Sequence, residues 1–163
     1  MARPVAGGTL DFSHMREAPA AFHRGLDTRT ESIIAFIDAA RATGIAGIYY
    51  AVQHAAYPLL SRAEFETFGR PYDRRVLASA ADLWCNMVHL HGSRVMFDLV
   101  ADYPAPLLNW HDRDTAISLR AGRATFPGAA RGGLAHGAVH PPAAGGLARG
   151  RAAGGRAPGG GER

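Results

Sequence analysis

Apolar residues recur at helical spacing over residues 19–40, and further along the chain they gather in short runs separated by other helical stretches. The long stretch begins at Pro19, which suits a first helical turn, and it ends before Gly44. This pattern predicts one long helix. The preceding segment, MARPVAGGTLDFSH, contains Gly-Gly and Pro and has no apolar period, so we predict a loop over residues 1–14.

Four short apolar runs predict strands, because they are rich in β-branched and aromatic residues or end in glycine. They cover residues 44–53, 84–92, 105–112 and 124–134, and Trp110 is expected in the core. Ser61 and Glu64 have the spacing of a capping box, which predicts a helix start, and Pro71 interrupts that helix. Further helices are predicted at 71–83, 94–104 and 114–124, the last one capped by Asp112 or Asp114.

The repeated order of helix and strand, with connections of a few residues, predicts an α/β fold in which helices link parallel strands. Alternation alone leaves open whether the sheet is doubly wound or an arc of a barrel. No glycine-rich nucleotide loop follows a predicted strand, which excludes the usual dinucleotide-binding class. A closed eight-stranded α/β barrel takes roughly 250 residues. The chain has 163 residues, so any barrel here is a partial one.

The net charge of +4 is concentrated in a tail of unusual composition. Residues 1–134 hold 14 Arg against 13 acidic residues, whereas residues 135–163 hold 4 Arg against 1. The tail is almost entirely Ala, Gly, Arg and Pro, so we expect it to be disordered and take 1–134 as the folded unit. It lacks the aromatic residues that accompany Arg-Gly segments in RNA binding, and we expect no nucleic-acid partner.

Cysteine content and hydropathy indicate the compartment. Cys85 is the single cysteine, which excludes an internal disulfide framework and is typical of a reducing environment. The sequence has no apolar run near the length of a membrane span and no secretory leader pattern. We therefore expect a cytoplasmic protein without a membrane partner.

Polar residues at the ends of the predicted strands are the candidates for ligand binding, because parallel α/β folds build their sites there. For binding of a small-molecule substrate they are Tyr50, Gln53, His89, His91, Asn109 and His111. Gly132 and Gly133 end the fourth strand, where they would allow close approach of the backbone to a ligand.

His89 and His91 also raise the question of a metal. Strand periodicity places both rings on one face, about 6 to 7 Å apart along the strand. That spacing suits either one metal ion or one anionic group. A zinc site needs three or four ligands, so metal binding by His89 and His91 is the alternative interpretation.

Several segments together resemble, in order, the latter part of the uroporphyrinogen decarboxylase superfamily. They are GIYYAVQHA, LSRAEFETFGRPYDRRVL, NMVHLHGSRVMFDLVADYPAPLLNWHDR and FPGAARGGL. The resemblance implies a partial (β/α)8 barrel. It also implies cofactor-free decarboxylation of the acetate side chains of uroporphyrinogen, in porphyrin and heme biosynthesis. Relatives in the superfamily transfer methyl groups to thiols through cobalamin and a bound zinc.

The motifs depart from the family at particular positions. Gln53 lies where the decarboxylase has a serine that contacts a substrate carboxylate, and Asn109 replaces an aspartate. His89-Leu90-His91-Gly92 is similar to the His-x-Cys-Gly stretch that supplies zinc ligands in the methyltransferase branch, with His91 in place of the cysteine.

Three functions follow from the resemblance. The first is a decarboxylase-like protein acting on a carboxylated tetrapyrrole without a cofactor, whose full-length parent would be a homodimer. The second is a zinc-dependent methyltransferase, and the third is a truncated barrel without activity. The resemblance assigns the catalytic arginine and aspartate to strands before Met1 and a late histidine to the region after Leu134. A reading-frame shift in a G+C-rich gene would explain the switch in composition at Ala135.

Overall fold

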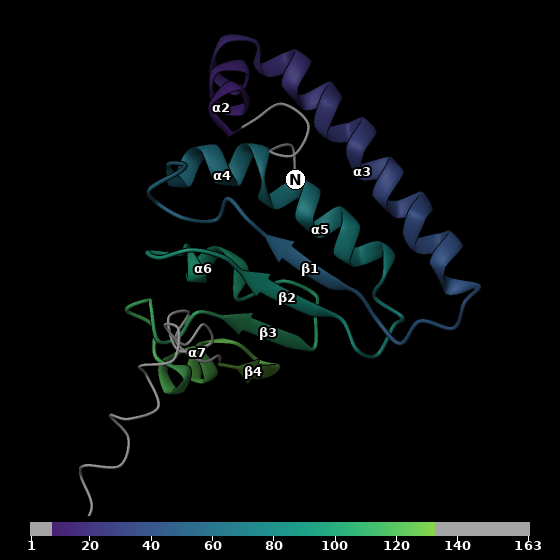
Figure 1. Ribbon diagram of the computed structural model, residues 1–163, viewed down its shortest axis with the longest axis vertical. Helices are drawn as coiled ribbons and strands as arrows, with labels where there is room; N and C mark the ends of the chain where they lie inside the picture. The colour runs from purple at the N-terminus through teal and green to yellow at the C-terminus, as the bar shows by residue number, and fades with distance from the viewer. Residues whose placement is uncertain (1–7, 133–163) are drawn as a thin grey trace, which may run out of the picture.

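The computed structural model of the protein describes residues 8–132 (Figure 1). Helices and strands alternate after an N-terminal helical pair. The elements are α2 (Gly8–Glu17), α3 (Pro19–Arg41), β1 (Tyr49–Val52), α4 (Arg62–Phe68), α5 (Arg70–Ser79), β2 (Met87–Leu90), α6 (Phe97–Val100), β3 (Leu107–Trp110), α7 (Leu119–Thr125) and β4 (Ala129–Arg131). The expected tail, residues 135–163, lies outside the described residues.

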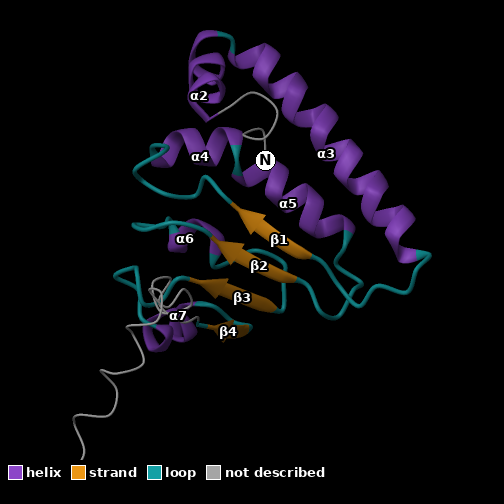
Figure 2. Cartoon of the chain, viewed as in Figure 1, coloured by secondary structure: helices purple, strands orange, loops and turns teal. Residues whose placement is uncertain are grey.

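The four strands form one parallel sheet in the order β1-β2-β3-β4 (Figure 2). Each strand pairs with the next one along the chain, and a helical segment connects every pair. The predicted mixed α/β fold with a parallel sheet and crossover helices is therefore confirmed. Among the described residues, no helix is long and apolar enough to span a membrane.

The two faces of the sheet differ in how they are covered. In β2 and β3 the burial of side chains alternates, so that Val88, Leu90, Leu108 and Trp110 are almost fully inaccessible. These residues form one core with apolar side chains of α4 to α6. The intervening residues of the same strands remain partly exposed. The sheet thus has one face under helices and one face that the described helices leave uncovered.

Trp110 is the largest fully buried side chain of the core, as expected from the sequence. Phe97 of α6 meets its ring edge to face at a centroid distance of 5.0 Å, and its indole N–H donates to the carbonyl of Ile117 at 2.8 Å. A Cβ on Gly122 would lie 2.3 Å from the indole ring. Glycine at this position therefore lets α7 lie directly on the tryptophan.

The predicted helix boundaries are right at Ser61 and wrong at two other places. The capping box is present, since the Ser61 hydroxyl accepts from the Glu64 amide and the Glu64 carboxylate accepts from the Ser61 amide. The last helix starts at Leu119 under a Ser118 cap, so the prediction that Asp112 or Asp114 caps a helix entered at Thr115 is wrong.

The predicted loop over residues 1–14 is also wrong from Gly8 onward, because Gly8–Glu17 is the helix α2. Its Met15 is only 3% exposed and belongs to the core, and Phe12 packs against that core. Tertiary packing therefore overrides the weak helical signal of a segment that contains a Gly-Gly pair. Residues 1–7 lie outside the described part of the chain.

The buried carboxyl group of Asp73, on α5, links β1 to the segment before β3 on the helix-covered side of the sheet. Asp73 accepts hydrogen bonds from the hydroxyl of Tyr50 in β1 at 2.7 Å and from the hydroxyl of Tyr103, before β3, at 2.8 Å. Burial raises the pKa of Asp73 to about 6, and the two hydrogen bonds oppose that rise. The same burial, together with the neighbouring carboxylate, raises the pKa of both tyrosines.

The raised pKa predicts a pH-dependent contribution to stability. The folded state holds the proton of Asp73 more tightly than the unfolded state, whose carboxyl titrates near 3.8. The contribution is therefore greatest below pH ~4 and is lost as the pH rises toward ~6, by an amount on the order of 1 to 3 kcal/mol. Asp73→Asn should abolish this difference, as measured by urea unfolding of both proteins from pH 4 to 7.

Asp38→Asn is the matched control, because its side chain is 62% exposed. Its free energy of unfolding should follow that of the wild type across the same pH range. A wild-type curve that stays parallel to that of Asp73→Asn would contradict the assignment of the buried proton.

Candidate functional site

Four residues form a row across the carboxyl half of the sheet. In the strand register Ala51 lies opposite His89, His89 opposite Asn109, and Asn109 opposite Arg131. Side chains that are direct neighbours in register point to the same face. His89 and Asn109 lie at the partly exposed positions of their strands, so the row lies on the uncovered face.

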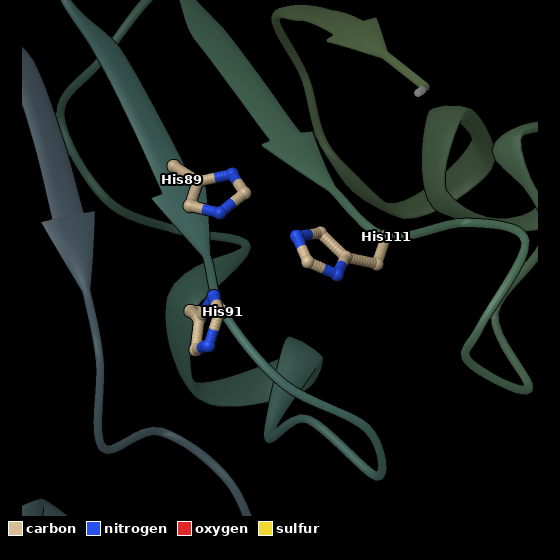
Figure 3. Close-up of side chains that lie close together, drawn as sticks. All are labelled: His89, His91 and His111. Carbon is tan, nitrogen blue, oxygen red and sulfur yellow. The ribbon is translucent and has the colours of Figure 1, made fainter. Parts of the chain in front are cut away.

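Three histidines meet at the ends of β2 and β3 (Figure 3). His91 follows β2 by one residue and His111 follows β3 by one residue, so each projects from the exit of its strand. The ring centroids of His89 and His111 are 5.2 Å apart, those of His91 and His111 are 5.3 Å apart, and those of His89 and His91 are 6.1 Å apart. One nitrogen from each ring lies within 4.8 Å of the other two.

Asn109 fixes the orientation of His89. The Asn109 amide nitrogen donates to the backbone carbonyl of Arg131 at 2.9 Å, which leaves the amide oxygen to face Nδ1 of His89 at 2.6 Å. Because that oxygen can only accept, Nδ1 of His89 must carry a proton. In the neutral ring the free lone pair is then on Nε2.

The environment of His89 favours the neutral ring. Burial lowers its pKa, the hydrogen bond with Asn109 raises it, and electrostatic repulsion from His111 and His91 lowers it further. Tyr49 stacks on the ring with centroids 5.6 Å apart and is itself 62% exposed. A neutral imidazole is the form that binds metal ions and that can both donate and accept hydrogen bonds.

Tyr50 and Gln53 are not part of the histidine cluster. Tyr50 is only 7% exposed, because strand alternation turns it toward the helices, where it binds Asp73. Both residues border a cavity of about 90 Å³ beside α2, α3 and α5. Typical ligand pockets hold roughly 300 to 1,000 Å³, so this cavity is too small for a tetrapyrrole. The three histidines are not among the residues that line it.

The glycine at the end of β4 has a packing role. A Cβ on Gly132 would lie 2.7 Å from a carboxylate oxygen of Asp112, whose side chain is 7% exposed. Gly132 therefore lets the chain pass close to Asp112 after β4. The predicted partner glycine, Gly133, lies outside the described residues.

Tyr49 and Arg131 are two polar residues at this face that the sequence analysis did not select. Tyr49 lies against His89, and Arg131 is opposite Asn109 in register and exposed. Strict alternation from His89 and Asn109 would have pointed to both, once the strand register was known. The register itself could not be obtained from one sequence.

Comparisons with known proteins found no matching family model, no matching curated protein and no matching solved structure.

The geometry predicts the titration of His89. Its pKa should lie below the ordinary value of about 6.5, and Asn109→Ala should lower it further, because the hydrogen bond that stabilises the charged ring is lost. Titration of the His89 Cε1–H resonance by NMR measures both values. A pKa of His89 that rises in Asn109→Ala would contradict this arrangement.

Proposed function

We propose that this chain is the later part of a (β/α)8 barrel related to the uroporphyrinogen decarboxylase superfamily, and that its uncovered sheet face binds a small carboxylated molecule. The observation that carries the proposal is the gathering of His89, His91, Asn109 and His111 at the carboxyl ends of two adjacent parallel strands. Parallel α/β folds place their ligand sites at this edge.

The sheet topology supports the barrel part of the proposal. Consecutive strands are neighbours throughout the described sheet, and every connecting segment contains a helix. A doubly wound sheet reverses its strand order at a switch point, and the four described strands contain no such reversal. Helices on one face, and polar side chains toward the carboxyl ends of the strands on the other, match the outside and the ligand-binding end of a barrel.

The chemistry of the face supports a carboxylated ligand. Arg131 places a permanent positive charge beside Asn109 in the strand register, and the imidazole rings of His91 and His111 lie nearby. Charge-assisted hydrogen bonds from such groups to a carboxylate are about twice as strong as those between neutral groups. Tyr49, stacked on His89, adds an aromatic surface on which a planar ligand can lie.

Decarboxylation by the parent barrel would require more than these residues. The resemblance assigns the substrate-clamping arginine and the essential aspartate to earlier strands, so the proposed role of this chain is substrate binding. We expect the chain alone to bind a carboxylated tetrapyrrole without releasing CO2. Substrate binding and CO2 release can therefore be measured separately.

Thiol methylation is less well supported. The corresponding branch of the superfamily holds its zinc through cysteines, whereas Cys85 precedes β2 and His91 follows it, at the opposite end of the strand. Cys85 lies in the turn before β2, whereas His91 and His111 follow the carboxyl ends of β2 and β3. The described residues therefore bring no thiolate to the histidines.

Binding of uroporphyrin, the stable oxidised form of the porphyrinogen, tests the proposal. Titration of the chain in EDTA, followed by tetrapyrrole fluorescence, should show saturable binding. Arg131→Ala should weaken it about ten-fold, as expected for one lost charge-assisted hydrogen bond worth about 1.5 kcal/mol. Arg24→Ala, an exposed arginine on α3, is the matched control and should bind like the wild type.

Two results would overturn the proposal. One is the absence of saturable uroporphyrin binding by a chain whose circular dichroism shows it to be folded. The other is equal loss of affinity in Arg131→Ala and Arg24→Ala, which would indicate attraction by overall charge alone.

A further inference from the structure

We infer that His89, His91 and His111 form a three-histidine site for one divalent transition-metal ion of the zinc type, open toward the uncovered face of the sheet. This ligand set comes from two adjacent strands and contains no cysteine. It goes beyond the cofactor-free binding site proposed above, and its existence does not depend on that function.

The ring positions are close to those a metal ion requires. Zn²⁺ binds imidazole nitrogen at about 2.0 to 2.1 Å, so the ligand nitrogens of a tetrahedral site lie ~3.4 Å apart. The nitrogens of the three histidines already lie within 4.8 Å of one another. Closing the remaining gap, at most ~1.4 Å per pair, requires only side-chain rotation, since two rings project from strand exits.

The orientation of His89 also favours metal coordination. Metal-bound histidines usually give their other ring N–H to an oxygen acceptor, which holds the ring and directs the lone pair at the metal. The Asn109 oxygen takes this role at 2.6 Å, and the Arg131 carbonyl anchors the Asn109 amide at 2.9 Å. His89 thus presents Nε2 for coordination before any ion binds.

The chemistry of the ligands selects the class of ion. Imidazole nitrogen suits Zn²⁺, Co²⁺, Ni²⁺ and Cu²⁺, whereas Mg²⁺ and Ca²⁺ require oxygen ligands. Three protein ligands leave at least one coordination position for water or an added ligand, as in catalytic zinc sites. If the proposed function holds, a carboxylate of the substrate would occupy that position beside Arg131.

The three rings are better suited to binding a metal ion than to binding an anion. A carboxylate site is best served by permanent cations, of which Arg131 is one at this face. The three imidazole rings, with centroids 5.2 to 6.1 Å apart, are instead close enough for one nitrogen of each to reach a single metal ion.

Metal titration of the full chain tests the inference. After EDTA treatment and dialysis, Co²⁺ should bind with one ion per chain and give visible d–d absorption, and Zn²⁺ should displace it. Replacing any one of His89, His91 or His111 by Ala should weaken binding at least about ten-fold. Asn109→Ala should weaken it about 10- to 100-fold, while Asn109→Asp, which keeps an oxygen acceptor, should retain it.

Two control variants separate this site from incidental binding. His14→Ala removes an exposed histidine of α2, and a His136→Ala/His140→Ala pair removes the histidines of the C-terminal segment. Both should bind Co²⁺ like the wild type. Circular dichroism and thermal unfolding of every variant show whether it remains folded, and His111→Gln provides a second substitution if His111→Ala does not fold.

Binding of less than one ion per chain would overturn the inference, and so would binding that survives the loss of all three histidines. The uroporphyrin titration is made in EDTA and the metal titration without porphyrin. Loss of one result therefore leaves the other standing, and the two proposals fail separately.

Discussion

The two-residue period of the parallel strands, combined with helices on one side of the sheet, is the constraint on which the rest of this structure depends. Leu90, Leu108 and Trp110 are each 0% exposed under the helices, where burial of their large apolar side chains is favourable. Their neighbours in sequence, His89 and Asn109, are then forced to the other face. The site follows from where the tryptophan and the leucines are buried.

This origin fixes the positions of the polar residues relative to one another. His89, Asn109 and Arg131 are consecutive positions in one register row, held by strand hydrogen bonds. His111 continues directly from Trp110, whose indole is fixed between α6 and α7. A site built on rigid strands needs less ordering of its side chains when a ligand binds, and so retains more of its interaction energy as affinity.

Much of the architecture could be predicted from the sequence, because it depends on local patterns. The long helix, the capping box at Ser61, the four strands and the burial of Trp110 all follow from periodicity and from known helix-start chemistry. The helix α2 and the start of α7 could not be predicted. The first depends on Met15 reaching a distant core, and the second on Ser118 competing with two nearby aspartates for the same capping role.

The candidate site was only partly predictable, for a related reason. Periodicity placed His89 and His91 on one face, but the meeting with His111 requires the register between β2 and β3, which is a long-range property. The sequence pointed to Tyr50, whereas its neighbour Tyr49 is the residue that contacts His89. A run of two tyrosines does not reveal which one faces the helices. The deciding partner, Asp73, is 23 residues away.

Gly122 connects the two faces in a way that bears on how this chain can vary. There is no room for even a methyl group between α7 and the Trp110 indole, so any larger residue must push the helix or the ring aside. Trp110 and His111 are adjacent, and a displaced indole would carry the imidazole with it. A substitution at this buried position, on the helix-covered side of the sheet, would thereby change the spacing of the three histidines without replacing any of them.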